Sequence, residues 1–307
     1  MLAPSPCPSE ELSFSSGTAA TEAPFPAAEL AVVVAPPPAA PEPVLWDART
    51  GTAHRHHAWE TVSSDQVALA GFLRDGAVFG FSLLCGVPCE AGAVAVVAEL
   101  FGAVRQTNYG RIFDVRVSVD ATNLADTSLP LSSHTDNPYR RPTPTLQLLH
   151  CLATGLEGGE TVLVDGFAAV ERLAASERVK VDVLANTPIR FAYQDAYAEL
   201  AADVSVITLT GDGKPIAIHV NNRSKGAPGG SAEQVAAWYD AYLALLAVID
   251  NPAQQVVLRL EPGDLILIDN ERVLHGRTGF VGAGMRHLQG CYADRDGLLS
   301  TLAVLQR

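Results

Sequence analysis

The sequence predicts a mainly β fold with flanking helices, of the double-stranded β-helix or jelly-roll kind, and three observations support this. Many short apolar segments of strand length are separated by turn residues. Glu261-Pro-Gly-Asp264 places Pro and Gly at the central positions of a type II turn between two such segments. One capping box, Ser231-Ala-Glu-Gln234, begins the single long helix, which is expected to end near Ile249. Many strands with few helices favour two stacked sheets over a parallel α/β sheet.

The expected elements follow from apolar periodicity and from capping residues. Ser63-Ser-Asp65 caps a helix that runs to about Arg74, and 78–84 is expected to be a buried strand. A second helix is expected over 89–100 and is closed by Gly102. The remaining strands are expected at Ile112 to Val119, Leu146 to Cys151, Thr161 to Val164, Ile189 to Tyr193, Val206 to Thr210, Ile216 to Val220, Val256 to Leu260, Leu265 to Asp269 and Arg286 to Tyr292.

Composition excludes several classes of protein. The 307 residues are 48% hydrophobic, so the chain is apolar enough to build a large core and is not mainly disordered. Lys plus Arg number 21 against 34 Asp plus Glu, a net charge of −13, which opposes binding to nucleic acid. Five scattered cysteines do not make a disulfide scaffold and favour a reducing cytoplasm. The chain shows no segment suited to a membrane, and we expect a cytoplasmic protein.

A composition shift divides the chain. Residues 1–43 are rich in Pro, Ala, Ser and Glu and are expected to form a disordered Pro/Ala-rich tail. Residues 44–307 contain no second Pro-rich break and no internal repeat, so they are expected to form one jelly-roll domain.

The residues most informative about chemistry are His134-Thr-Asp136 and His275. In extended backbone, residues two apart point to the same face, so His134 and Asp136 can bind one ion. His275 lies 139 positions after Asp136, just past a strongly apolar strand. Two imidazoles and one carboxylate leave open positions on a metal, which suits non-haem Fe(II) oxygen chemistry. Arg286 follows at the start of the next strand and could hold a carboxylate bidentately, with Arg277 as the competing candidate.

Longer motifs carry a family resemblance. Between about Val78 and Asp296, the chain resembles the γ-butyrobetaine and trimethyllysine dioxygenases, which are 2-oxoglutarate-dependent oxygenases in the wider taurine-dioxygenase-like group. The motifs are Tyr109-Gly-Arg-Ile-Phe113, Asn123-Leu-Ala-Asp-Thr, His134-Thr-Asp136-Asn-Pro, Leu146-Gln-Leu-Leu-His-Cys151, Gly158-Gly-Glu-Thr161, Val164-Asp-Gly-Phe167, Glu261-Pro-Gly-Asp264, Asp269-Asn270, His275-Gly-Arg277 and Arg286-His-Leu-Gln-Gly-Cys-Tyr292. The family's N-terminal zinc-binding module has no counterpart in these residues.

The resemblance implies a set of cofactors and ligands. It implies Fe(II) held by His134, Asp136 and His275, with 2-oxoglutarate and O2 as co-substrates. It implies that Arg286 binds the far carboxylate of 2-oxoglutarate, and that Asn123 and Leu149 line the co-substrate site. The expected reaction hydroxylates an unactivated C–H bond and releases succinate and CO2.

The substrate-binding residues depart from the family pattern. Tyr109, Phe113 and Tyr292 match aromatic positions of the family's cage for a trimethylammonium group. Asp126 and Asn137 stand at two cage positions that are Tyr in butyrobetaine hydroxylases. With Asn222 added to this set, we expect a small cationic substrate such as an amine, a betaine or an amino acid.

Three alternatives remain open at this stage. The same iron chemistry could perform desaturation, cyclisation or N-demethylation in natural-product biosynthesis. A non-catalytic metal-binding or sensor protein on this fold would lack part of the triad or the arginine, whereas all four residues are present. A homodimer is an open alternative to a monomer.

Overall fold

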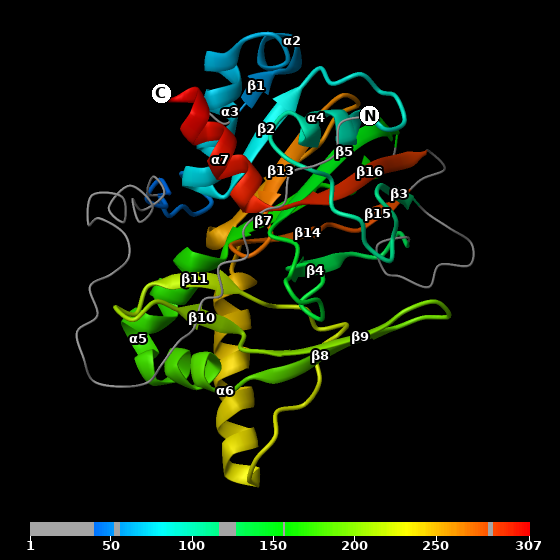
Figure 1. Cartoon of the computed structure of the whole chain (residues 1–307). Helices are drawn as coiled ribbons and strands as arrows, with labels where there is room; N and C mark the ends of the chain where they lie inside the picture. Colours follow the sequence, from blue (N-terminus) through cyan, green and yellow to red (C-terminus); the bar gives the residue numbers. More distant parts are fainter. Residues whose placement is uncertain (1–39, 52–55, 117–126, 156, 282–284) are drawn as a thin grey trace, which may run out of the picture. The chain divides into compact units, whose positions relative to one another are not determined.

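The computed structural model describes residues 40–51, 56–116, 127–155, 157–281 and 285–307 (Figure 1). Residues 40–307 form one compact unit. The expected tail, 1–43, lies outside the described ranges except for its last four residues. None of the described helices is long and apolar enough to cross a bilayer.

The larger sheet has six strands in the order β1-β2-β13-β5-β16-β3. β1 runs parallel to β2, and every other neighbouring pair is antiparallel. The strands are β1 His56–Ala58, β2 Phe81–Cys85, β3 Phe113–Arg116, β5 Leu146–Thr154, β13 Leu265–Asp269 and β16 Arg286–Ala293.

A second sheet has four antiparallel strands in the order β12-β7-β14-β4. These are β4 Leu131–His134, β7 Thr161–Asp165, β12 Gln255–Leu258 and β14 Val273–Arg277. Three two-stranded pairs complete the strands: β6 Glu157–Gly158 with β15 Phe280–Val281, β8 Ile189–Gln194 with β9 Glu199–Val204, and β10 Ile207–Leu209 with β11 Pro215–Ile218.

Alternating side-chain directions along β13, which is buried at every position, explain how the two large sheets stack. Ile266 and Ile268 of β13 pack with Leu163 of β7 and Val256 of β12 in one core cluster shared by both sheets. The intervening β13 residues pack on the other face, in a cluster with residues of α3, α4 and α7. Because side chains alternate along a strand, one apolar strand fills two layers.

The helices lie in two groups (Figure 1). α2 Trp59–Val62, α3 Gln66–Phe79, α4 Ala93–Glu99 and α7 Arg295–Leu305 accompany the larger sheet. α5 Gly166–Asn186 and α6 Ala232–Ile249 pack together and share a core with β8 to β11 and with Val164 and Leu274 of the four-stranded sheet. Helices and strands take up comparable shares of the described chain, so the protein is mixed α/β with several antiparallel sheets, and the prediction of a mainly β fold is corrected.

Local signals explain which elements were predicted. The Asp65 side chain accepts a hydrogen bond from the Ala68 amide, and the capping box at Ser231 is formed, so both helix starts are confirmed. The Glu261 turn is also confirmed, with Gly263 at φ 92° and the Asp264 amide donating to the Glu261 carbonyl. The strand expected from residue 78 was wrong at its start, because α3 continues to Phe79 and ends at Gly80, whose φ is 78°.

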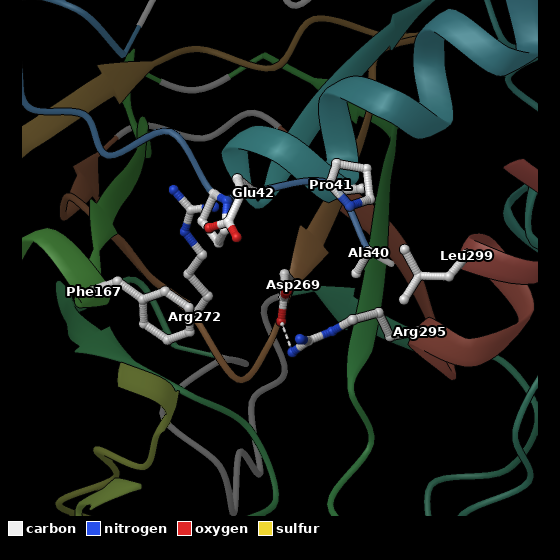
Figure 2. A pocket seen from close by; sticks show the side chains of 10 residues that line it. Ala40, Pro41, Glu42, Phe167, Asp269, Arg272, Arg295 and Leu299 are labelled. Atoms are coloured by element: carbon white, nitrogen blue, oxygen red, sulfur yellow. Dashed lines mark hydrogen bonds and ion pairs between the residues drawn. The ribbon is translucent and has the colours of Figure 1, made fainter. Parts of the chain in front are cut away.

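Arg272 lines the hollow that Figure 2 shows and forms a buried ion pair with Asp165 of β7. Arg272 donates from Nε and Nη2 to the two carboxylate oxygens of Asp165, at 3.1 and 2.8 Å. The same guanidinium donates to the carbonyls of Val44 and Val78. The hollow has a volume of about 170 Å³ and is lined on one side by residues 40–43. These four residues of the expected tail therefore lie against the domain.

Candidate active site

The sheet register brings the predicted metal ligands together. His134 ends β4 and is the register partner of His275 on β14, and Asp136 follows two residues later. One donor atom from each of the three residues lies within 4.8 Å of the others. His134 Nε2 is 3.3 Å from Asp136 Oδ1, and His275 Nε2 is 3.8 Å from Asp136 Oδ2. The described residues hold no other such cluster.

Neighbouring groups fix the orientation of these ligands. The Nδ1–H of His134 donates to the Ser132 carbonyl at 2.9 Å, which turns Nε2 toward the other ligands. Gln147 Nε2 and the Tyr292 hydroxyl donate to Asp136 Oδ2 at 2.7 and 2.8 Å. Asn270 binds the backbone of Asp136 at both its amide and its carbonyl. The carboxylate is therefore held in place by both its side chain and its backbone.

Burial and charge act on the ionisation of the cluster. Burial raises the pKa of Asp136, but a hydrogen bond from His134 and the positive charge of Arg223 act in the opposite direction, and the net pKa lies below the usual range. Burial, assisted by His134, lowers the pKa of His275 to about 3. The cluster thus presents an ionised carboxylate and a neutral His275, which are the forms that bind a divalent metal.

The cluster opens into a cavity of about 670 Å³, which also contains the predicted co-substrate residues Leu149 and Arg286. Among the described residues, the guanidinium of Arg286 has no hydrogen-bond or ion-pair partner, and burial lowers its pKa. Its guanidinium lies 5.7 Å from the ring centroid of Phe280. Arg277 lines the same cavity, but its Nη2 donates to the carbonyls of Thr127 and Leu129.

Five aromatic rings follow one another along the cavity wall. Centroid separations are 5.1 Å from Tyr292 to Phe113, 6.3 Å from Phe113 to Tyr109, 5.7 Å from Tyr109 to Tyr193 and 5.1 Å from Tyr193 to Tyr139. The first three were predicted, but Tyr139 and Tyr193 were not. Tyr139 belongs to the His-Thr-Asp-Asn-Pro-Tyr segment, which offered a signal that this ring lies near the metal ligands. Tyr193 lies on a strand without any motif, so the sequence offered no signal for it.

The predicted polar residues have different outcomes. Asn137 lines the cavity, is buried at φ 56°, and accepts a hydrogen bond from the Tyr139 hydroxyl. Asn222 does not line the cavity; its side chain accepts from Tyr242 on α6, and the preceding residue, Asn221, faces the cavity. Asn123 and Asp126 lie outside the described residues.

Comparison with known proteins agrees with this geometry. The family model described as taurine catabolism dioxygenase TauD, TfdA family, matches residues 50–292. γ-Butyrobetaine dioxygenase of Pseudomonas sp. (strain AK-1) is 39% identical over 229 residues, which cover 74% of this chain and 60% of that protein. Mitochondrial trimethyllysine dioxygenase of Bos taurus is 29% identical over 270 residues, covering 85% and 64%. The chain thus spans less than two thirds of the length of these relatives.

A solved structure shares the fold. Asparagine oxygenase, solved with Fe(II), 3-hydroxyasparagine and succinate, matches with a TM-score of 0.60 at 23% identity, covering 75% of this chain and 79% of that one. The resemblance predicted from the sequence motifs is confirmed by the family match. The chain belongs to the TauD/TfdA family of Fe(II)- and 2-oxoglutarate-dependent dioxygenases.

Proposed function

We propose that this chain is an oxygenase that hydroxylates an unactivated C–H bond of a small cationic molecule. One observation carries the proposal: a single cavity joins the His134, Asp136 and His275 cluster to an arginine without a carboxylate partner among the described residues and to a row of five aromatic rings. Each part suits one component of such a reaction, namely the metal, the co-substrate and the substrate.

The metal would be held by His134, Asp136 and His275. Two imidazoles and a carboxylate are the donor set of non-haem Fe(II) oxygenases, and three ligands leave positions for other molecules. When bound, iron and 2-oxoglutarate supply the oxidising chemistry, with release of succinate and CO2. Gln147 and Tyr292 donate hydrogen bonds to one oxygen of Asp136 and would hold this carboxylate in place for the metal.

Arg286 would hold the distal carboxylate of 2-oxoglutarate. A half-buried guanidinium without a protein carboxylate is electrostatically suited to an incoming one, and Arg binds carboxylates in bidentate geometry. Arg277 is less suited, because its Nη2 already donates to two backbone carbonyls. Leu149 supplies an apolar part of the same cavity. Asn123 remains a prediction for this site.

The aromatic row favours a positively charged substrate. Ring faces attract cations by about 0.5 to 2 kcal/mol each, depending on desolvation. The net charge of −13 adds a long-range attraction for cations. The relatives named for γ-butyrobetaine and trimethyllysine support this substrate class, since both names describe trimethylammonium compounds. A carboxylate at Asp126 would favour amines that can donate hydrogen bonds over quaternary ammonium groups.

The test measures succinate release with Fe(II), 2-oxoglutarate and a panel of substrates. The panel contains γ-butyrobetaine, its less methylated analogues and basic amino acids, and it is run on wild type and on Asp126→Asn. Product masses separate hydroxylation, which adds one oxygen, from desaturation, which removes two hydrogens, and from N-demethylation, which releases formaldehyde. Metal binding without substrate-stimulated succinate from any member would contradict the oxygenase proposal. Preference for anionic substrates, unchanged in Asp126→Asn, would contradict the cationic substrate class.

A further inference from the structure

The loop of residues 220–226 has two faces with different partners. Asn221, Arg223 and Ser224 line the active-site cavity. Asn222 and Lys225 instead contact aromatic residues of α6. The loop therefore connects the cavity wall to a helix that contributes no residue to the cavity lining.

On its cavity side, the loop is tied to the metal-ligand segment. The Thr135 amide donates to the Val220 carbonyl at 2.8 Å, and Asn221 Nδ2 donates to the Thr135 carbonyl at 3.0 Å. Thr135 stands between two of the predicted metal ligands. Arg223 Nη2 is 4.0 Å from Asp136 Oδ1. A shift of this loop would move polar groups next to the reacting centre.

The loop is also tied to β8, which forms part of the aromatic row. The Ala192 amide donates to the Ser224 carbonyl at 2.9 Å, and the Gly226 amide donates to the Arg190 carbonyl at 2.7 Å. Tyr193 follows Ala192 directly, and its ring stacks on that of Tyr139. The position of the loop is thus coupled to the position of an aromatic side chain in the cavity.

On the helix side, Lys225 lies among three aromatic rings. Its ammonium is 5.4 Å from the ring centroid of Trp238 and 5.2 Å from those of Tyr239 and Tyr242. Such distances allow cation–π attraction to each ring. The chain contains only three lysines among its 21 basic residues, so a lysine at this place stands apart from its general use of arginine.

A hydrogen bond reinforces this attachment. The Tyr242 hydroxyl donates to Asn222 Oδ1 at 2.7 Å. Trp238 and Tyr242 are themselves 0% and 2% exposed and belong to the core shared with α5. α6 is therefore fixed by core packing, and its contacts with Lys225 and Asn222 can hold the loop in one position.

We propose that Lys225 and Asn222 are positioning residues, through which α6 sets the cavity face of the 220–226 loop and thereby the substrate site. This inference rests on the proposed function for its kinetic effect. Neither residue touches the metal-ligand cluster, and the co-substrate arginine lies on another element, β16. The two residues therefore affect binding of the substrate that is to be hydroxylated and leave 2-oxoglutarate binding unchanged.

The kinetic test compares Lys225→Met, Tyr242→Phe and Lys225→Arg with wild type. Lys225→Met keeps the side-chain length and removes the charge, and we expect the KM for the oxidised substrate to rise roughly tenfold, equivalent to about 1.4 kcal/mol. Tyr242→Phe keeps a ring for Lys225 and removes the hydrogen bond to Asn222, so we expect a rise of roughly threefold. In both variants, kcat and the KM for 2-oxoglutarate stay within about twofold of wild type. Lys225→Arg restores a cation that can stack on the rings and recovers most of the loss.

A matched control and a second measurement keep the two proposals distinguishable. Lys214→Met removes an exposed lysine elsewhere and leaves all constants unchanged. Hydrogen exchange followed by mass spectrometry needs no turnover, and in Lys225→Met it should show faster exchange in residues 220–226 and β8 but not in α6. If wild type never releases succinate, the function proposal fails while the exchange result still tests the loop.

Two results would overturn the inference. One is wild-type KM and wild-type exchange in Lys225→Met. The other is an equal rise in the KM values for substrate and 2-oxoglutarate, which would indicate general loss of structure rather than positioning.

Discussion

Replacing Arg272 by Met should destabilise the protein more than any surface substitution, because it leaves Asp165 buried without its cation. The side chains of Arg272 and Asp165 are 1% and 0% exposed and are joined by two hydrogen bonds. Removing one partner of such a pair costs about 3 to 5 kcal/mol. Asp165 retains hydrogen bonds from the amides of Trp46 and Phe167, which places the loss toward the lower end of this range.

A double-mutant cycle tests the origin of this loss. Asp165→Asn alone leaves a buried guanidinium and should cost a similar amount, whereas Arg272→Met/Asp165→Asn leaves no unpaired charge. We therefore expect the double variant to be at least about 2 kcal/mol more stable than the sum of the single losses predicts. Urea unfolding of metal-free protein, followed by circular dichroism, gives the free energies.

An exposed ion pair provides the control. Arg178 and Asp182 lie 3.0 Å apart on α5 with side chains about half exposed, so Arg178→Met should cost less than about 1 kcal/mol. The reasoning is refuted if Arg272→Met loses no more than this control, or if the single losses at Arg272 and Asp165 simply add.

Three further predictions concern the active site. His134→Ala should lower Fe(II) affinity, measured by anaerobic titration, by more than the ~10- to 100-fold cost of losing an outer-shell partner, and unchanged affinity would remove His134 from the metal site. Arg286→Ala should raise the KM for 2-oxoglutarate roughly 30- to 700-fold, as expected for about 2 to 4 kcal/mol, whereas Arg277→Ala should mainly lower Tm; the reverse pattern would exchange their roles. A Cβ at Gly290 would lie 2.4 Å from Phe113 Cζ, so Gly290→Ala should displace that ring and raise the KM for a cationic substrate several-fold, and an unchanged KM would show that the ring does not contact substrate.

Most of the metal-ligand cluster could be predicted, because two of its residues stand in one short motif and His and Asp side chains are common metal ligands. His134 and Asp136 are two residues apart, and His275 follows the strand predicted at Leu265 to Asp269 and found with the same bounds. The sequence could not reveal the register that places His275 of β14 opposite His134 on the adjacent strand β4. Such pairing depends on long-range packing, for which a single sequence carries no local signal.

The helix content and part of the cavity wall were missed for similar reasons. α5 begins at Gly166 and contains non-helical backbone at Glu177, so its periodicity is interrupted, and no helix was predicted over these residues. Tyr193 was assigned correctly to a strand, but its place in the aromatic row depends on where the β8–β9 pair lies. Asn222 was predicted to bind substrate, but its neighbour Asn221 lines the cavity instead, because no periodicity predicts the direction in which a loop residue points.

Because β4 lies at the edge of its sheet, the supply of iron would affect the resistance of the folded protein to proteolysis. Among the described strands, β4 has one hydrogen-bonded neighbour, β14, and the register between them shifts between His275 and Arg277. An ion bound by His134 and His275 would cross-link this outer strand to the next one. A ligand that binds only the folded state stabilises it by about 2.7 kcal/mol at a hundredfold excess over its Kd. When iron is scarce, the edge strand would open more often to proteases, so iron limitation would reduce the amount of protein as well as its turnover.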